Sequence, residues 1–359
     1  MSADLHVIIP AGGAGTRLWP LSRRSRPKFL LDLTGSGRTL LQATVDRMTP
    51  LAASITIVTG TAHREGVLAQ LPEFGDPTRE DRQLVIEPSP RDSMPAIGLA
   101  TYLVRERYGD DALVGSFAAD HVIARPDLLR DAVRCAQGAA RGGYVTTIGI
   151  APSEASTAYG YIRPGGTVGD GPARVVESFV EKPDAATAAR YVERGYLWNA
   201  GMFVMGAGTL AGHLERLDPA LNAGLSRIAA AWGSGDRETV LAEVWPGLTR
   251  IAIDHAIAEP VAASGGVAVV PASTGLGWSD LGDFAALGEL SADEGGAVRV
   301  DAPSNRVYAT SGQEVSLVGV SGLVVVVTPD AVMVTRPGAA QDVKKVVEEL
   351  GSRGRTDLL

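Results

Sequence analysis

Hydrophobic residues occur in short β-branched runs along the first part of the chain, and longer stretches with helical spacing separate these runs. Five such runs precede residue 151: Leu5–Ile9, Ile55–Thr59, Leu84–Glu87, Ala112–Phe117 and Val145–Ile150. Strands that alternate with helices are typical of a sheet wound with helices on its faces. The pattern therefore predicts an α/β core.

Three of the intervening helices have ends that can be read from the sequence. Thr39 begins a capping-box pattern with Gln42 three residues later. A second helix is predicted over Pro95 to Gly109, because proline is favoured in a first turn and glycine after a last one. A third is framed by the range Asp184 to Gly195. We expect these helices to cover the predicted sheet.

The pattern changes after about Leu290, where short β-branched runs are separated by Gly, Ser and Pro-Asp turns. The predicted strands are Arg306–Thr310, Val315–Val320, Leu323–Thr328 and Val332–Thr335. The amphipathic segment Gln341–Leu350 predicts a closing helix. We therefore expect two domains: a larger α/β domain over residues 1–288 and a small β-rich domain over residues 289–359.

Composition excludes several classes of partner. The 359 residues are 45% apolar and 21% charged, and the net charge of −8 provides no diffuse basic surface for a nucleic acid. No apolar run approaches the ~20 residues that span a bilayer. The single cysteine, Cys135, allows no internal disulfide and fits a reducing compartment. We expect a cytoplasmic protein with no membrane or nucleic-acid partner, so any phosphate ligand must be held by a local cluster.

The glycine-rich segment directly after the first predicted strand is the most informative chemical signal. Gly12, Gly13 and Gly15 allow a sharp turn that brings backbone N–H groups against an anion. Arg17 offers two parallel donors to phosphate oxygens, and Lys28 offers a compact positive charge. The segment therefore predicts a phosphate-binding loop.

Two familiar glycine motifs do not describe this loop. A dinucleotide-binding fingerprint needs a third glycine where Leu18 stands, and a Walker A loop needs a Gly-Lys-Ser/Thr string that the chain lacks. A plain glycine turn between strand and helix stays open as the structural alternative, although Arg17 and Lys28 disfavour it.

Several motifs together resemble those of the sugar-nucleotide pyrophosphorylases. Besides Gly12-Gly13-x-Gly15-Thr16-Arg17-Leu18 and Lys28, the chain carries EPSPRDSMPA from Glu87, ADHVI from Ala119, YGYI from Tyr159, EKPD from Glu181, WNAGMF from Trp198 and GWSDLGDF from Gly277. This set, in its order, is most similar to the bacterial mannose-1-phosphate guanylyltransferases, roughly from Leu5 to Leu350. The monofunctional type is implied, because bifunctional relatives carry a further isomerase domain that this chain is too short to contain.

The resemblance implies a Rossmann-like, GT-A-like nucleotidyltransferase domain with a mixed sheet. It also implies that the small C-terminal domain is β-helix-like and used in packing or in homodimer contacts. The implied reaction converts GTP and mannose 1-phosphate to GDP-mannose and pyrophosphate, by in-line attack of the sugar phosphate on the α-phosphorus. Two alternatives stay open: a pyrophosphorylase for another sugar phosphate or nucleotide, and a catalytically silent relative that binds nucleotide sugars.

The resemblance also implies roles for individual residues. Arg17, Lys28 and Asp120 are the expected catalytic residues, and Mg²⁺ is the expected cofactor, held by Asp120 and Asp280. Such acids alone are as readily turn or cap residues, so both assignments depend on the resemblance. Hard carboxylate ligands do suit Mg²⁺. The expected nucleotide-binding residues of the loop are Ala11, Gly12, Gly13, Gly15, Thr16, Arg17 and Lys28.

The sugar phosphate is assigned to a second group of residues by the same resemblance. Lys182 is expected on the phosphate, Glu181 and Asn199 on sugar hydroxyls, and Gly160 at a close backbone contact. An exposed Glu-Lys pair without these motifs is usually solvated surface. These four residues therefore form a prediction that depends on the family pattern.

The segment expected near the base departs from that pattern. Where the family usually has Gly-Arg-Asn-Thr-Ala-Pro, this chain has Pro90-Arg91-Asp92-Ser93-Met94-Pro95. A carboxylate at Asp92 matches the N1 and N2 hydrogens of guanine, and Arg91 matches O6 or a phosphate. Pro95 belongs to the same expected nucleotide contact. The alternative is that Asp92 or Ser93 caps the helix that begins near Pro95.

Overall fold

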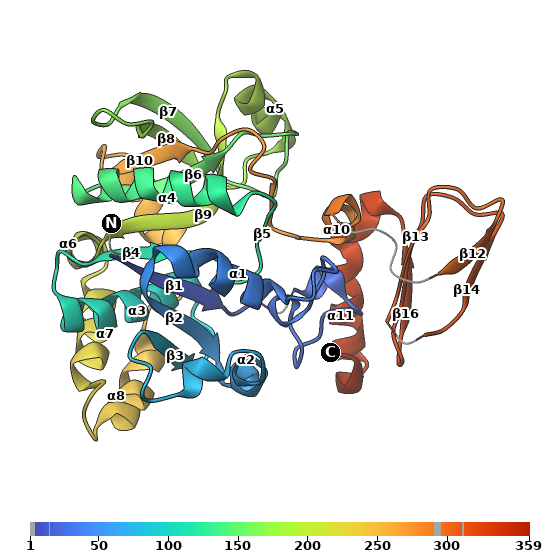
Figure 1. Cartoon of the computed structure of the whole chain (residues 1–359), viewed down its shortest axis with the longest axis horizontal. Helices are drawn as coiled ribbons and strands as arrows, with labels where there is room; N and C mark the ends of the chain where they lie inside the picture. The colour runs from blue at the N-terminus through green and yellow to red at the C-terminus, as the bar shows by residue number, and fades with distance from the viewer. Residues whose placement is uncertain (1–3, 14, 291–295, 311) are drawn as a thin grey trace.

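A nine-stranded mixed sheet forms the core of the computed structural model, which describes residues 4–13, 15–290, 296–310 and 312–359 (Figure 1). The strand order is β3-β2-β1-β4-β9-β6-β10-β8-β7. The bounds are β1 Leu5–Ala11, β2 Ala52–Gly60, β3 Arg82–Glu87, β4 Leu113–Ser116, β6 Val145–Ile150, β7 Tyr161–Thr167, β8 Arg174–Val180, β9 Leu197–Gly206 and β10 Val267–Pro271. The predicted α/β class with a mixed sheet is confirmed.

The first four strands of this order, β3, β2, β1 and β4, are mutually parallel, whereas β9 runs antiparallel to β4 and β6. All five strands predicted before residue 151 are present, and β1 extends two residues further than expected, to Ala11. Parallel strands end at one edge of a sheet, and ligands of wound α/β folds bind outside that edge. The segments that follow β1, β3 and β4 therefore meet at one place.

Helices cover both faces of the sheet. Side chains alternate along β1: Ile8 packs with α3, α6, α7 and α8, whereas Val7 and Ile9 pack with α1, α2 and α4. The bounds are α1 Leu40–Met48, α2 Arg64–Gln70, α3 Ser93–Tyr108, α4 Pro126–Arg141, α5 Ala185–Glu193, α6 Ala207–Leu217, α7 Pro219–Ala231, α8 Arg237–Val244, α9 Glu259–Ala262 and α10 Phe284–Leu290. The fold is doubly wound, with one apolar layer on each side.

The predicted helix ends agree with the structure to within about two residues. Thr39 caps α1 in a capping box: its hydroxyl accepts from the Gln42 N–H at 3.3 Å, and the Gln42 side chain accepts from the Thr39 N–H at 3.1 Å. Helix α3 begins at Ser93, two residues before the expected Pro95, because Asp92 is its N-cap. Proline thus lies within the first turn, where its missing N–H costs nothing.

The C-terminal strands form a separate small β unit at one end of the molecule, with α10 and α11 between it and the large sheet (Figure 1). Two of its pairings are parallel, β12 (Ala297–Val300) with β14 (Val315–Val318) and β13 (Arg306–Ala309) with β15 (Val324–Val327). Strand β16 (Val332–Thr335) pairs antiparallel with β15, and α11 spans Val343–Ser352. The predicted strands are therefore present. Among the helices of the described residues, none has the length and apolar content that crossing a bilayer requires.

The C-terminal unit packs against Leu18 and Trp19, the residues that follow the glycine loop. Leu18 and Trp19, which follow the loop, lie in one buried cluster with Phe284 of α10 and Tyr308 of β13. The Trp19 Nε1–H donates to the carbonyl oxygen of Leu358 at 2.8 Å. The C-terminal unit therefore supports the loop from behind.

This contact generates a prediction for Trp19→Phe, which keeps an aromatic ring in the buried cluster but removes the indole donor and part of the ring volume. We expect the free energy of unfolding to fall by at least about 1 kcal/mol, the usual net contribution of one buried hydrogen bond, with a further loss from the unfilled volume. Amide hydrogen exchange at residues 355–359 and in α11 should become faster, while exchange in α4 stays unchanged and serves as the internal control. Unchanged exchange of the C-terminal residues would contradict the proposed anchoring.

Candidate active site

The glycine loop leaves β1 at the edge of the sheet and folds back onto Lys28. Gly15 has φ +64°, and a Cβ there would lie 2.7 Å from the Lys28 Cβ. Lys28 begins the short 3₁₀ turn Lys28–Leu30 and is buried. Gly12 and Gly13 are exposed, with their backbone facing outward. Only Gly15 is required by backbone conformation, so the other two glycines are available for close approach by a ligand.

The ammonium group of Lys28 joins the two acids that the motifs singled out. Its Nζ lies 2.8 Å from Asp120 Oδ2 and donates to the main-chain carbonyl oxygen of Asp280 at 2.6 Å. Lys28, Asp120 and Asp280 are thus gathered at the mouth of the glycine loop, although they are distant in the sequence. Asp120 remains partly exposed, at 29% of its side chain, so a ligand can reach it.

A two-stranded ladder brings the two acids together. Strand β5 (Val122–Ile123) follows Asp120, and β11 (Trp278–Ser279) precedes Asp280. The two strands pair antiparallel, with Ser279 opposite Val122. Asp120 and Asp280 therefore lie at the same end of the ladder.

Positive charge dominates the phosphate side of this site. Burial acts to raise the pKa of Asp120, but the charges of Lys28 and His121, together with the hydrogen bonds that the carboxylate accepts, outweigh burial and hold this pKa below its usual value. Arg17 is half-buried, and its guanidinium has no hydrogen bond or ion pair with the described residues. An unpaired, partly desolvated cation beside exposed backbone N–H groups is suited to an anion.

Asp120 and Asp280 are the residues that fit a divalent cation. The Lys28 ammonium contacts the Asp120 carboxylate and the main-chain carbonyl oxygen of Asp280, while the Asp280 carboxylate accepts from the Tyr159 hydroxyl. Within the described residues, no group of three or more His, Cys, Asp or Glu side chains forms a complete metal cage. A hard cation that keeps several waters and takes phosphate oxygens suits such a two-carboxylate site.

A second cluster contains all four residues expected at the sugar phosphate. Gly160 is buried against Glu181, whose Oε2 would collide with any Cβ at that position. The Asn199 N–H donates to the Gly160 carbonyl oxygen at 2.8 Å. Lys182 pairs with Glu181 and has φ +45°, a strained conformation for a residue with a side chain. The structure thus brings these four residues together.

Tyr159 links the two clusters, and sequence reasoning gave it no role. Its hydroxyl donates to Asp280 Oδ1 at 3.0 Å, and its ring contacts Trp198 at 4.8 Å and Trp278 at 5.3 Å between centroids. Burial, and then the Asp280 charge, raise the pKa of Tyr159, so the phenol stays protonated as a donor. The only sequence signal was its place before Gly160 in the YGYI motif.

The segment expected at the base has its polar groups engaged elsewhere. The Arg91 guanidinium donates to the carbonyl oxygens of Pro246 and Leu248. Asp92 has φ +68°, and its carboxylate accepts from the Ser93 N–H at 2.8 Å. Pro95 is buried in the first turn of α3. The helix cap given as the alternative for Asp92 is therefore present, and a base contact by Arg91, Asp92 or Pro95 stays a prediction.

Glu87 is a site residue that sequence reasoning quoted in a motif without assigning it a function. It ends β3, and its Oε1 lies 3.6 Å from the position a Cβ on Gly12 would take. The side chain is 6% exposed, and its Oε2 has no hydrogen-bond partner within the described residues. Burial raises the pKa of Glu87 to about 7. A buried acceptor beside the glycine loop lacks the donors that would normally accompany it.

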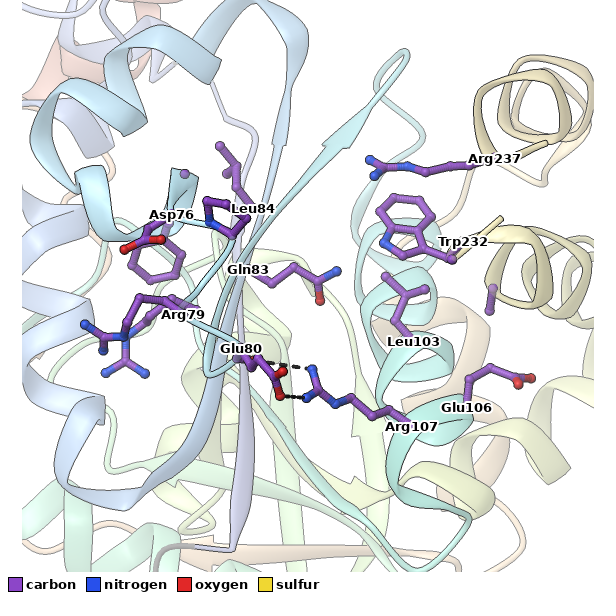
Figure 2. A pocket seen from close by; sticks show the side chains of 16 residues that line it. Asp76, Arg79, Glu80, Gln83, Leu84, Leu103, Glu106, Arg107, Trp232 and Arg237 are labelled. Carbon is purple, nitrogen blue, oxygen red and sulfur yellow. Dashed lines mark hydrogen bonds and ion pairs between the residues drawn. The ribbon is translucent and has the colours of Figure 1, made fainter. Parts of the chain in front are cut away.

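A cavity of about 650 Å³ lies at the edge of the sheet. Figure 2 shows its lining side chains, which come from β3, the segment before it, α3 and the α7–α8 region. Its Arg107 pairs with Glu80 across the cavity, and its Arg79 pairs with Asp81 at 2.9 Å. The lining contains no described residue of the glycine loop. Because these arginines already have acidic partners, we do not assign the phosphate ligand to this cavity.

Two family models match consecutive parts of the chain, and two named relatives match nearly all of it. The family model "Nucleotidyl transferase" matches residues 6–295, and the model "MannoseP isomerase/GMP-like beta-helix domain" matches residues 295–350. The chain is 39% identical over 365 residues to the mannose-1-phosphate guanylyltransferase ManC of Salmonella typhimurium, covering 98% of this chain and 74% of that protein. It is 37% identical over 368 residues to the xanthan biosynthesis protein XanB of Xanthomonas campestris, covering 99% and 75%.

A solved structure agrees with the fold over nearly the whole chain. The crystal structure described as a "mannose-1-phosphate geranyltransferase" from Thermus thermophilus superposes with a TM-score of 0.84 at 32% sequence identity. The match covers 97% of this chain and 99% of that one. The C-terminal β unit is therefore part of the shared architecture.

The loop geometry predicts different outcomes for two neighbouring glycines. Gly15→Ala should lower the free energy of unfolding by roughly 2 kcal/mol, from the left-handed conformation together with the clash on Lys28. Gly13→Ala is the matched control, since no atom of the described residues beyond its chain neighbours lies within 4 Å of its Cβ position, and should stay within about 0.5 kcal/mol. Urea denaturation measures both. Equal effects would show that Gly15 is not conformationally required.

Proposed function

Because the chain belongs to the nucleotidyl transferase family, we propose that it is a mannose-1-phosphate guanylyltransferase, which converts GTP and α-D-mannose 1-phosphate to GDP-mannose and pyrophosphate. The observation that carries this proposal is the contact of Lys28 with the Asp120 carboxylate and with the main-chain carbonyl oxygen of Asp280 at the glycine loop. The name of the Salmonella relative, at 39% identity over 98% of the chain, supports the choice of substrates.

The nucleotide triphosphate is assigned to the glycine loop. The backbone of Ala11, Gly12, Gly13, Gly15 and Thr16 surrounds the phosphates, and Arg17 and Lys28 neutralise the charge that grows on the leaving pyrophosphate. Arg17 has its guanidinium free of partners among the described residues, which supports this role. Lys28 is released from Asp120 when a phosphate oxygen replaces the carboxylate as its partner.

The sugar phosphate is assigned to the second cluster, and it is the nucleophile. Lys182 binds its phosphate, and Glu181 and Asn199 bind sugar hydroxyls at the backbone of Gly160. A phosphate monoester has a second pKa of ~6 and is already an anion at neutral pH, so no general base is needed. Catalysis then rests on in-line positioning of the two substrates and on charge neutralisation.

Mg²⁺ is the proposed cofactor, with Asp120 and Asp280 as its protein ligands. When bound, it neutralises charge on the reacting phosphates. Tyr159 holds Asp280 through its hydroxyl, and the β5–β11 ladder holds both acids at one end. These residues keep the two carboxylates in place before substrate arrives.

Glu87 is proposed to select guanine. Guanine offers two adjacent donors, N1–H and N2–H, to a carboxylate. Glu87 has a buried Oε2 without a donor within the described residues, and its Oε1 lies beside Gly12 of the loop. Arg91 and Asp92 remain proposed contacts to the nucleotide, for which their present hydrogen bonds would have to change.

Three further assignments accompany the reaction. We assign residues 1–288 to the catalytic domain and 289–359 to the β-rich domain. The exposed valines of that β unit, Val298, Val300, Val318, Val332 and Val334, support a homodimer contact. The cytoplasm is the proposed compartment, because the only cysteine, Cys135, is a free thiol.

The first test is turnover with GTP, mannose 1-phosphate and Mg²⁺. We expect pyrophosphate and GDP-mannose in equal amounts from the wild type. Lys28→Met should lower kcat by about 10²–10³-fold at saturating substrate, because a preorganised donor to the leaving group is lost. Lys344→Met, which changes an exposed lysine of α11, is the matched control and should retain full activity.

A panel of other sugar 1-phosphates and nucleotides, run alongside, separates the alternatives. Faster turnover of another pair would favour a different pyrophosphorylase, and tight GDP-mannose binding without product would favour a silent relative. Near wild-type turnover by Lys28→Met would refute the assigned role of the loop.

The second test uses the pH dependence of GTP binding. Only the charged carboxylate of Glu87 accepts from both guanine donors, and its pKa is about 7, so GTP affinity should fall by about tenfold for each pH unit below 7. Glu87→Gln should bind GTP more weakly at pH 8 and lose this dependence. The phosphates of GTP titrate alike in both proteins, so the difference between the two profiles reports the carboxyl group. Parallel profiles would contradict guanine recognition by Glu87.

A further inference from the structure

The side-chain amide of Asn199 is largely committed to the protein. Its Oδ1 accepts from the Thr147 hydroxyl at 3.1 Å and from the Gly201 N–H at 3.2 Å. Its Nδ2 donates to Asp254 Oδ1 at 2.6 Å. The Gly201 backbone donor fixes which end of the amide is oxygen. One N–H of Asn199 therefore remains, and a ligand hydroxyl cannot use this residue as a free acceptor.

Acceptors for sugar hydroxyls must come from the neighbouring carboxylates. Each hydroxyl carries one donor hydrogen that needs a partner when water is excluded. Glu181 has a buried Oε2 with no hydrogen bond in the described part of the chain, and Gly160 leaves space only because it lacks a Cβ. Asp254 uses Oδ1 for Asn199, and a carboxylate has acceptor sites on both oxygens. Two acceptors thus flank the single free donor of Asn199.

Asp254 comes from an element that the motif analysis did not touch. It begins the π-helical turn Asp254–Ala258, directly after the buried Ile253. Single π-turns often occur at functional sites because they re-aim one side chain. The turn brings Asp254 to Asn199 of β9, beside Glu181 at the end of β8. Three separate elements therefore converge on one polar wall.

The charges around this wall favour a ligand that donates hydrogen bonds. Burial, and then the charge of Glu181, raise the pKa of Asp254 to about 6, while the Asn199 amide opposes the shift. The nearby basic groups are Lys182, which pairs with Glu181, and His255, which pairs with Glu259 at 2.8 Å. Glu259 also accepts from the Glu181 N–H at 3.3 Å. Carboxylates outnumber basic groups here, so hydroxyl groups that donate hydrogen bonds to them would offset the repulsion between neighbouring negative charges.

From this convergence, and resting on the proposed function, we propose that Asp254 is a sugar-specificity residue: it accepts a hydrogen bond from a ring hydroxyl of the hexose 1-phosphate and holds the Asn199 amide so that its free N–H reaches the same sugar. Asp254 and Glu181 then recognise the arrangement of the sugar hydroxyls, and Lys182 binds the phosphate. A hexose that differs at the contacted carbon leaves one buried acceptor without a donor, which is a strong basis for rejection.

Asp254→Asn tests this role, because it keeps the shape and replaces one acceptor oxygen by a donor. We expect the KM for mannose 1-phosphate to rise by at least about tenfold, the KM for GTP to change by less than about twofold, and discrimination against glucose 1-phosphate to shrink. Asp131→Asn, which changes an exposed carboxylate of α4, is the matched control and should behave as wild type. A purely structural role would instead alter both KM values together.

Deoxy analogues of mannose 1-phosphate identify the contacted hydroxyl. One analogue should be a poorer substrate than mannose 1-phosphate for the wild type, and the penalty should vanish in Asp254→Asn, since the two changes remove the same hydrogen bond. If the loss of kcat/KM relative to mannose 1-phosphate is, for every analogue, as large in the variant as in the wild type, the inference is overturned. An inactive wild type would refute the proposed function, whereas an active wild type with additive losses refutes only this role.

A crystal structure of the wild-type chain with mannose 1-phosphate provides a test that does not depend on the variant. We expect a ring hydroxyl within about 3 Å of an Asp254 carboxylate oxygen, the ordinary length of such a bond. A bound sugar with its hydroxyls turned away from Asp254 would overturn the proposal.

Discussion

The contact of one buried ammonium group with two acids organises the whole site. Lys28 reaches Asp120 at the carboxyl end of β4 and the main chain of Asp280 after β11. Its own position depends on Gly15, where no side chain fits beside it. Because a buried charge without partners is strongly unfavourable, this arrangement is stable only when the loop, the strand end and the ladder are all in place. The phosphate side of the site is therefore fixed before any ligand arrives.

Unsatisfied acceptors characterise the places assigned to the base and to the sugar. Glu87 and Glu181 each bury a carboxylate oxygen that has no donor among the described residues, and Asp254 lies close to a second acid. Such groups each cost the folded state roughly 1–3 kcal/mol. A ligand that donates hydrogen bonds to these acceptors recovers this free energy on binding. The groups proposed to recognise base and sugar therefore destabilise the protein when no ligand is bound. In this proposal basic side chains bind the phosphates, and carboxylates accept hydrogen bonds from the base and the sugar hydroxyls.

The C-terminal unit belongs to this site through packing. Leu18 and Trp19, immediately after the loop, share a buried cluster with Phe284 and Tyr308, and the Trp19 indole donates to the carbonyl oxygen of Leu358. The segment that directly follows the loop is therefore anchored in an apolar cluster, whereas Gly12 and Gly13 are exposed.

The sequence alone determined the α/β class, most strands and helix caps, and the loop with Arg17 and Lys28, because strand periodicity, capping boxes and glycine turns depend on neighbouring residues. It did not assign functions to Glu87, Tyr159 or Asp254, since their significance arises from burial and from partners such as Gly12, Asp280 and Asn199 that are distant in the chain. Tertiary structure also showed that the polar groups of Arg91 and Asp92 already have partners. Donor and acceptor types can be read from residue letters, but which of them remain free is decided only when the chain packs.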